Sequence, residues 1–162
     1  MQVFLPYGSD FVSSAQALDN KRLNKQLLEC RQILAALAGE TKGWVNHPAT
    51  VQFKYHEDWL FEYAMACTNE MIDRDIAYQN NFDAIVTLFN KFRVYGSTSF
   101  PAFLNDSRLE YTHRANLYLK DPEHYAQWAS YATDYQQHTC CKNSKKPCQY
   151  WWASHEERNN ND

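Results

Sequence analysis

The sequence predicts an all-α fold: a compact single-domain bundle of about five helices, with an extended N-terminus and an irregular C-terminal tail. Apolar residues recur at helical spacing in several segments, and no segment shows the alternation of a β-strand over a useful length. Only 4 Gly and 5 Pro occur in 162 residues, too few for a turn-rich β-sandwich. We expect a helical domain over residues 1–137 and a polar, basic and aromatic tail over 138–162, which packs on it or extends from it.

The first long helix is expected after an extended segment of about residues 1–12. Ser13 and Gln16 have the spacing of a capping box, which predicts a helix start. An apolar stripe at helical spacing follows, formed by Leu23, Leu27, Leu34 and Ala38. Gly39 is expected to end this helix, because glycine readily adopts the left-handed conformation at a helix C-terminus.

Two more helices are expected in the middle of the chain. Pro48 suits the first turn of a helix that continues to about residue 76. Its apolar stripe comprises Leu60, Ala64, Cys67 and Met71. A shorter helix over about 81–92 carries Ile85, Leu88, Phe89 and Phe92. Residues 96–101 are predicted to form a loop.

The last two helices have their own start patterns. Ser107 and Glu110 form a second capping box, which predicts a helix to about Lys120. Asp121 and Pro122 supply the N-cap and first-turn chemistry of a final helix. Its expected apolar stripe is Tyr125, Trp128, Ala132 and Tyr135.

Several protein classes are excluded by composition. No run of about 18 apolar residues is present, so we expect no membrane span. The first residues lack the basic and apolar regions of a secretion signal, and five cysteines do not suit a disulfide framework. We therefore expect a cytoplasmic protein with reduced thiols. No phosphate-binding glycine loop or G-x-S-x-G motif occurs, and no cofactor is predicted.

The charges are unevenly distributed along the chain. Residues 20–55 hold six basic and two acidic residues. Residues 57–83 hold one basic and seven acidic residues, and residues 91–120 hold five basic and two acidic residues. Two basic segments flanking an acidic helix could offer a basic face to phosphates, although the net charge is −3. The alternative is a set of ordinary solvated helix faces.

The first long helix carries the most promising polar group. Lys21, Arg22, Lys25 and Gln26 lie within two turns, and Lys25 shares a face with Glu29 at i, i+4 spacing. This pattern indicates a carboxylate beside phosphate-binding cations. A simple surface ion pair would give the same spacing.

A second candidate site precedes Pro48. Lys42, Trp44, Asn46 and His47 place a cation, an indole, an amide and an imidazole at a helix N-terminus, which attracts anions. The alternative is a structural Trp anchor followed by an Asn or His helix cap.

Two further candidates lie in the C-terminal half. His113, Arg114 and Asn116 could contact phosphates or base edges, although a single His is commonly just exposed. Trp151 and Trp152 follow three lysines, a composition typical of a base-stacking platform; a C-terminal aromatic plug closing the core is the alternative.

A cluster near the C-terminus raises the question of zinc. Its members are His138, Cys140, Cys141, Cys148 and His155. Because it has no paired C-x-x-C, we predict no metal site there, and a small zinc-stabilised interaction protein stays an alternative.

Three segments in this order resemble the pyrimidine dimer DNA glycosylase family, which is typified by a phage endonuclease V. They are the opening MQVFLPY with SAQALDNKRLNKQLLECRQIL, then ETKGWVNHPATVQFKYHEDWLFEYA, then THRANLYLKDPEHY. The resemblance covers about residues 1–125. It implies a small helical enzyme, expected to be a monomer, that acts on double-stranded DNA with a damaged or modified base.

The resemblance also implies a mechanism and its residues. The chain-start amine attacks C1′ of the damaged nucleotide and forms a Schiff base, and Glu29 stabilises the sugar cation and assists proton transfer. Because Gln2 is bulky and should leave the first Met in place, the nucleophile would be the Met1 amine, or another group such as Lys25. The residues implied in DNA contact are Lys21, Arg22, Lys25, Gln26, Lys42, Trp44, Asn46, His47, His113, Arg114, Asn116, Tyr125, Trp151 and Trp152. A non-catalytic DNA- or nucleotide-binding protein on the same scaffold is the alternative.

Overall fold

The computed structural model describes residues 1–92, 99–133 and 149–154. Within these residues the chain forms seven α-helices and two short 3₁₀ helices, η1 and η2, which confirms the predicted all-α class. The expected number of about five is exceeded because two predicted helices are interrupted. The domain boundary predicted between residues 137 and 138 falls outside the described residues and stays a prediction.

The chain divides into two compact units, each considered by itself. One comprises Met1–Phe4 and Asp10–Pro101, and the other comprises Leu5–Ser9 and Ala102–Asp162. The helices of the first unit are α1 (Phe11–Ala17), α2 (Asn20–Leu37), α3 (Pro48–Phe53), α4 (Glu57–Asp73) and α5 (Gln79–Phe89). Those of the second are η1 (Ala102–Asn105), α6 (Ser107–Lys120), η2 (Ala126–Trp128) and α7 (Ala129–Thr133).

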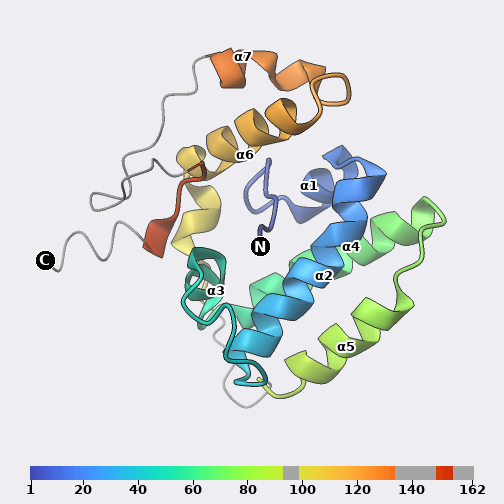
Figure 1. The fold of residues 1–162 in the computed structure, drawn as a ribbon, viewed down its shortest axis with the longest axis vertical. Helices are drawn as coiled ribbons and strands as arrows, with labels where there is room; N and C mark the ends of the chain where they lie inside the picture. The colour runs from blue at the N-terminus through green and yellow to red at the C-terminus, as the bar shows by residue number, and fades with distance from the viewer. Residues whose placement is uncertain (93–98, 134–148, 155–162) are drawn as a thin grey trace, which may run out of the picture. The chain divides into compact units, whose positions relative to one another are not determined.

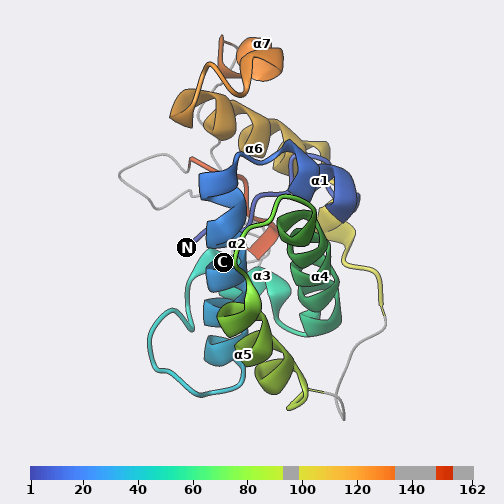
Figure 2. The ribbon, with the colours of Figure 1, turned by 90° about the vertical axis from the view of Figure 1, so that its right-hand side faces the viewer.

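The first unit is organised around α2. This helix packs against α3, α4 and α5, and α1 packs against α4 (Figure 1). Figure 2 shows α2 and α4 from the side, with α5 crossing near their ends. The apolar stripes predicted for these helices form the buried core, including Leu23, Leu27, Leu34, Leu60, Ala64, Met71 and Ile85.

The predicted single helix from Ser13 to Ala38 is two helices. Asp10, and not Ser13, caps α1, because its side chain accepts the backbone N–H of Ser13. The chain is extended at Leu18 and Asp19, and the Asp19 side chain accepts the N–H of Arg22 to start α2. Gly39, at φ +74°, ends α2 as expected.

The predicted helix from Pro48 to about residue 76 is also interrupted. Pro48 occupies the first turn of α3 as predicted, and the His47 ring caps that helix. Tyr55 then adopts φ +68°, and its N–H donates to Glu57 Oε1 over 3.1 Å. This contact turns the chain into α4, so that α3 stays only six residues long.

In the second unit α6 packs against α7, η1 and η2. Asp106 caps α6, one residue before the predicted cap. The prediction of a helix that begins at Asp121 and Pro122 is wrong, since residues 122–125 form a turn. The short helices η2 and α7 follow this turn. None of the helices described is long and apolar enough to traverse a bilayer.

Candidate active site

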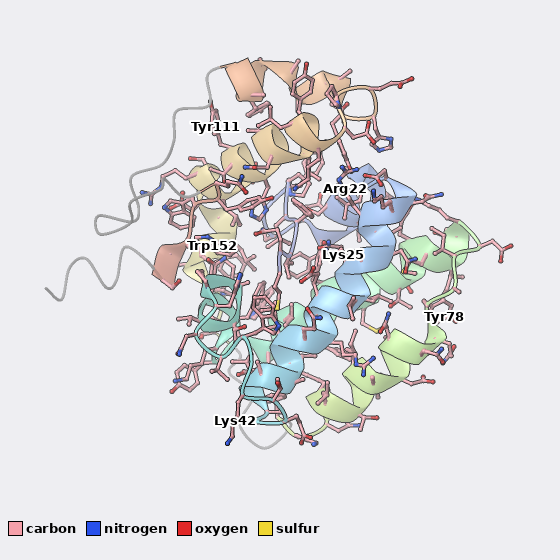
Figure 3. All side chains as sticks on the ribbon, in the orientation of Figure 1. Arg22, Lys25, Lys42, Tyr78, Tyr111 and Trp152 are labelled. Atoms are coloured by element: carbon pink, nitrogen blue, oxygen red, sulfur yellow. The ribbon has the colours of Figure 1, made fainter. Side chains whose placement is uncertain are left out.

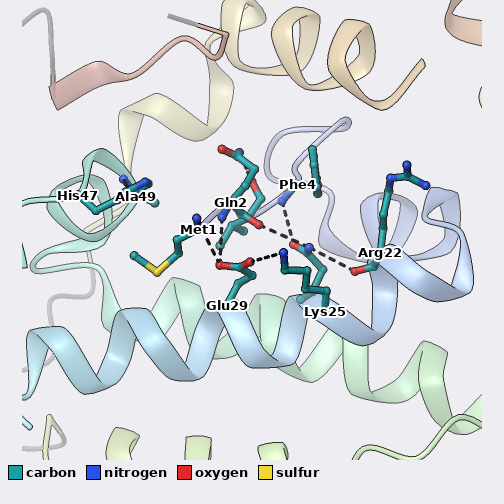
Figure 4. Close-up of polar contacts among 10 residues, drawn as sticks. Met1, Gln2, Phe4, Arg22, Lys25, Glu29, His47 and Ala49 are labelled. Carbon is teal, nitrogen blue, oxygen red and sulfur yellow. Dashed lines mark hydrogen bonds and ion pairs between the residues drawn. The ribbon is translucent and has the colours of Figure 1, made fainter. Parts of the chain in front are cut away.

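The start of the chain lies against α2 and meets Glu29. The α-amine of Met1 is 3.9 Å from Glu29 Oε2, and the backbone N–H of Gln2 donates to the same oxygen over 3.1 Å (Figure 4). The Met1 side chain is fully buried while the residue as a whole is partly exposed, so the exposed area belongs to its backbone atoms. The structure thus brings together the two groups that the sequence analysis assigned to catalysis.

Glu29 is a buried carboxylate surrounded by donors. The residue is 4% exposed, and Lys25 Nζ lies 3.5 Å from its Oε1, on the other side from the chain start. A buried carboxylate requires such partners, because an isolated charge away from water is costly. Each oxygen of Glu29 therefore faces a different amine.

The next residues of the chain are held by Gln26, one turn before Glu29. Gln26 Oε1 accepts the backbone N–H of Phe4 over 2.9 Å. The Tyr63 hydroxyl on α4 lies 2.8 Å from the Phe4 carbonyl oxygen. Gln26 and Tyr63 are both buried, so the predicted DNA contact of Gln26 would require its side chain to leave the chain start.

The solvent face of α2 is basic. Lys21, Lys25 and Arg31 are exposed along it, and Lys25 is the cation nearest Glu29. Figure 3 shows Lys25 and Arg22 on this helix. Arg22 is half-buried and pairs with Asp19, the residue that caps the helix, which gives it a structural partner as well.

The loop before α3 presents exposed groups of the first unit. Trp44 is 53% exposed and adopts φ +65°, and Lys42 and Asn46 are exposed beside it in sequence. His47 is half-buried, its Nδ1 accepts the N–H of Ala49 over 3.1 Å, and its ring contacts the Trp44 ring edge-on. His47 is therefore the helix cap that the sequence analysis left open, whereas Trp44 is no buried anchor.

Comparison with known families identifies the chain. The family described as pyrimidine dimer DNA glycosylase matches residues 1–86, more than half of the sequence. The chain belongs to this family. Neither a curated protein nor a solved structure matched the chain. The matched residues of this pyrimidine dimer DNA glycosylase family member include Met1, Glu29 and the loop around Trp44, whereas the resembling segment at residues 112–125 lies beyond them.

In the second unit of this glycosylase-family chain, His113 and Asn116 are buried. His113 Nδ1 accepts the backbone N–H of Leu5 over 2.8 Å, and burial lowers the pKa of His113 to about 3. Asn116 Nδ2 donates to the carbonyls of Thr112 and Gln149. The two side chains could contact a strand only by leaving these partners.

Arg114 is also engaged within the second unit. Its guanidinium donates to the carbonyl of Pro6, the hydroxyl of Tyr131 and the carboxylate of Glu110. It also lies over the Tyr7 ring, 5.0 Å from the ring centre. These contacts give Arg114 structural partners within the unit, and its contact with DNA stays a prediction.

The aromatic candidates of the second unit lie in its interior. Tyr125 is fully buried and stacks on Trp128, with ring centres 5.4 Å apart. Trp151 and Trp152 are buried, and Arg108 lies over the Trp151 ring at 4.6 Å. Of the two readings given for the C-terminal tryptophans, burial favours the aromatic plug.

The prediction of no metal site concerns a cluster of Cys and His side chains near the C-terminus. The Cys and His cluster at residues 138–155 lies outside the described residues. Among the residues that are described, no group of three or more His, Cys, Asp or Glu side chains could hold a metal ion. Cys30 and Cys67 are free and buried, and burial raises the pKa of Cys67 to about 12.

Tyr63 is the site residue that the sequence analysis missed. It sits on the buried face of α4, beside the predicted stripe residues Leu60, Ala64 and Cys67. A buried Tyr hydroxyl usually has a hydrogen-bond partner, so a Tyr within such a stripe indicates a buried hydrogen bond. The partner itself, the Phe4 carbonyl, is 59 residues away in sequence and could not be inferred.

Proposed function

We propose that this chain excises a damaged or modified pyrimidine from double-stranded DNA and then cleaves the strand at the abasic site, through a Schiff base on the Met1 α-amine. The observation that carries the proposal is the 3.9 Å separation between that amine and the buried Glu29 carboxylate. Membership of a DNA glycosylase family supplies the substrate class. An amine beside a carboxylate is the pairing that nucleophilic catalysis with proton transfer requires.

The proposed reaction has two stages. In the first, the Met1 nitrogen bonds to C1′ while the bond from C1′ to the base breaks, and the base leaves with the electron pair and takes up a proton. Loss of an N–H proton, followed by cleavage of the C1′–O4′ bond in which O4′ keeps the electron pair and takes up a proton, gives the protonated Schiff base. In the second stage, removal of a C2′ proton expels the 3′ phosphate and cleaves the strand.

Glu29 is suited to both stages of this reaction. Its negative charge would stabilise the cationic sugar that develops as the base leaves. Its Oε2 lies next to the Met1 amine, so it can also accept the proton that the amine loses. The hydrogen bond from the Gln2 N–H fixes the orientation of this carboxylate before substrate binds.

The exposed basic residues of the first unit form the proposed DNA surface. Lys21 and Lys25, which are exposed on the same helix as Glu29, would neutralise phosphates along α2. In the loop before α3, Lys42 and Asn46 would contact the backbone, and the exposed Trp44 ring would stack on an unpaired base.

The test is borohydride trapping on three duplexes that contain a pyrimidine dimer, an abasic site or a modified pyrimidine. Borohydride adds hydride to the Schiff base carbon and leaves a stable secondary amine. We expect a covalent adduct whose DNA-linked peptide begins at Met1. Absence of an adduct on all three duplexes, together with salt-sensitive binding, would establish the non-catalytic DNA-binding alternative.

A matched variant tests the role of the Glu29 carboxylate in strand cleavage. Glu29→Gln keeps an oxygen that can accept the Gln2 N–H but removes the negative charge. Strand cleavage should fall by about 100-fold or more, while binding of the abasic duplex changes little. An unchanged cleavage rate would remove Glu29 from the mechanism.

A further inference from the structure

The residues that follow Met1 are fixed to α2 at alternate positions. The N–H of Gln2 donates to Glu29, and the N–H of Phe4 donates to Gln26. Alternate N–H groups of an extended chain point the same way and are about 7 Å apart. Side chains at i, i+3 on a helix are about 5–6 Å apart on one face. Gln26 and Glu29 therefore form two consecutive attachment points for an extended chain start.

Gln26 uses both ends of its amide in this arrangement. Its Oε1 accepts from the Phe4 N–H at 2.9 Å, and its Nε2 lies 3.5 Å from the Gln2 carbonyl and 3.3 Å from the Arg22 carbonyl. Since a backbone N–H can only donate, the oxygen of the amide must face Phe4. The residue is 1% exposed, so water does not compete for these bonds.

Tyr63 completes the contact from a second helix. Its hydroxyl lies 2.8 Å from the Phe4 carbonyl oxygen and 2.9 Å from Gln26 Oε1, and its single hydrogen can be donated to only one acceptor at a time. The ring is fully buried and packs edge-on against Phe11 of α1. The Phe4 N–H is thus bonded to the buried Gln26 side chain, and the Phe4 carbonyl oxygen lies within hydrogen-bond distance of the buried Tyr63 hydroxyl.

We infer that Gln26 and Tyr63 are positioning residues for the proposed reaction, which hold the backbone at Phe4 so that the Met1 amine stays at Glu29. The inference rests on the proposed Schiff base chemistry. A chain start is ordinarily poorly ordered unless it is tied down, and a nucleophile must be held close to its attack geometry. Gln26 and Tyr63 act three residues away from the amine and need not touch the DNA.

The variants that test this inference are Gln26→Met and Tyr63→Phe. Gln26→Met removes the amide at nearly constant volume, and Tyr63→Phe removes only the hydroxyl. The matched control is Thr68→Val on the same helix, because the Thr68 hydroxyl is also buried but bonds only within α4, to the Ala64 carbonyl. Circular dichroism and melting curves define a temperature at which all the proteins are folded.

The first readout is single-turnover borohydride trapping on an abasic duplex. Because a displacement of about 1 Å can reduce a rate 100-fold, we expect the maximal rate to fall roughly 10- to 100-fold in both variants. The DNA concentration at half-maximal rate should change by less than about twofold, since neither side chain contacts the strand. Thr68→Val should match the wild type. Unchanged maximal rates in folded Gln26→Met and Tyr63→Phe would overturn the inference.

The second readout needs no DNA. Reductive methylation with formaldehyde and cyanoborohydride labels amines, and mass spectrometry of the N-terminal peptide gives the rate at Met1 relative to Lys21. Release of the chain start from α2 should make Met1 react several-fold faster in Gln26→Met and Tyr63→Phe than in Thr68→Val. Equal labelling of Met1 in the three variants would overturn the inference, whether or not the wild type forms an adduct with DNA. Absence of an adduct in the wild type would contradict only the proposed function.

Discussion

Glu29 Oε2 lies 3.1 Å from the backbone nitrogen of Gln2 and 3.9 Å from the α-amine of Met1. The Glu29 carboxylate is therefore hydrogen-bonded to the backbone of the second residue, Gln2. The α-amine belongs to Met1, one residue before this hydrogen bond. This relationship makes the length of the chain start critical, because adding a residue moves the amine and leaves the Gln2 contact in place.

The first prediction concerns that length. Two extra residues, Gly-Ser, placed before Met1 convert the amine into an amide and should reduce trapping on an abasic duplex by about 100-fold or more. The same two residues added after Asp162 serve as the control and should have no effect. Intact mass confirms which residue begins each protein. Equal trapping by the two proteins would show that the nucleophile is not the chain-start amine.

The second prediction separates Lys25 from the Met1 amine. Lys25 is 65% exposed and lies 3.5 Å from Glu29 Oε1, so it is the second amine at the same carboxylate. In Lys25→Met the adduct should still form and should still map to the Met1 peptide, while the slope of log affinity against log salt falls by about one. Loss of the adduct in this variant would make Lys25 the nucleophile.

A matched control for Lys25→Met is Asn69→Asp. Asn69 is exposed on α4, and the substitution changes the net charge by the same one unit. We expect Asn69→Asp to leave the salt slope unchanged, since only cations that contact phosphates contribute to it. Equal changes in the two variants would indicate a general charge effect in place of a contact by Lys25.

The third prediction tests the loop before α3. Trp44→Ala should weaken binding to a duplex containing an unpaired base by about tenfold, because stacking on an aromatic ring contributes about 1–3 kcal/mol per base. Trp44→Phe should retain most of the affinity. Ile72→Ala removes another exposed apolar side chain, 50% exposed on α4, and should have no effect. The slope of log affinity against log salt should be the same in the wild type and in all three variants. Equal affinities of Trp44→Ala and the wild type would show that another residue stacks on the base.

The extent to which sequence predicted this structure depends on the range of each interaction. Local patterns were sufficient for the stripe of α2, the end of that helix at Gly39 and the first turn of α3 at Pro48. They were insufficient at Asp19, where an Asp cap interrupts a continuous apolar stripe. An apolar stripe indicates which face of a helix is buried, but it does not show whether one helix or two consecutive helices carry it.

The candidate site shows the same division. The i, i+4 spacing of Lys25 and Glu29 is a local pattern, and the structure contains that ion pair. The pairing of Met1 with Glu29 came from family resemblance, since no local rule connects residues 28 positions apart. The sequence left open whether Trp151 stacks on bases or closes the core, and it gave no sign that His113 is buried, because burial is decided by packing between distant segments.

The fourth prediction follows from the buried His113. Its folded-state pKa of about 3 lies below the ordinary value of 6.5, so the unfolded chain binds the proton first as the pH falls. The stability that neutral His113 contributes is complete above about pH 6.5 and is lost progressively toward pH 3. At pH 5 the loss relative to pH 7 is about 2 kcal/mol.

The measurement compares His113→Asn with the wild type between pH 7 and pH 5. Asn offers an oxygen where Nδ1 accepts the Leu5 N–H, but it does not titrate in this range. The wild type should therefore lose roughly 4–8 °C more of its Tm than the variant over this interval. Parallel loss of Tm in the two proteins would mean that His113 is not held neutral.

The fifth prediction compares three glycines. Gly8 adopts φ +55°, and a Cβ there would lie 2.3 Å from the Leu104 carbonyl oxygen of the same unit, so Gly8→Ala should destabilise by about 3 kcal/mol. Gly39 has φ +74° but open space around it, and Gly39→Ala should cost about 1 kcal/mol. Gly43 has neither constraint, since its nearest neighbour, Thr41 Oγ1, is 3.5 Å away, and Gly43→Ala should be close to neutral. Urea unfolding gives the order, and a Gly8→Ala variant as stable as Gly43→Ala would contradict the close approach of Gly8 to Leu104.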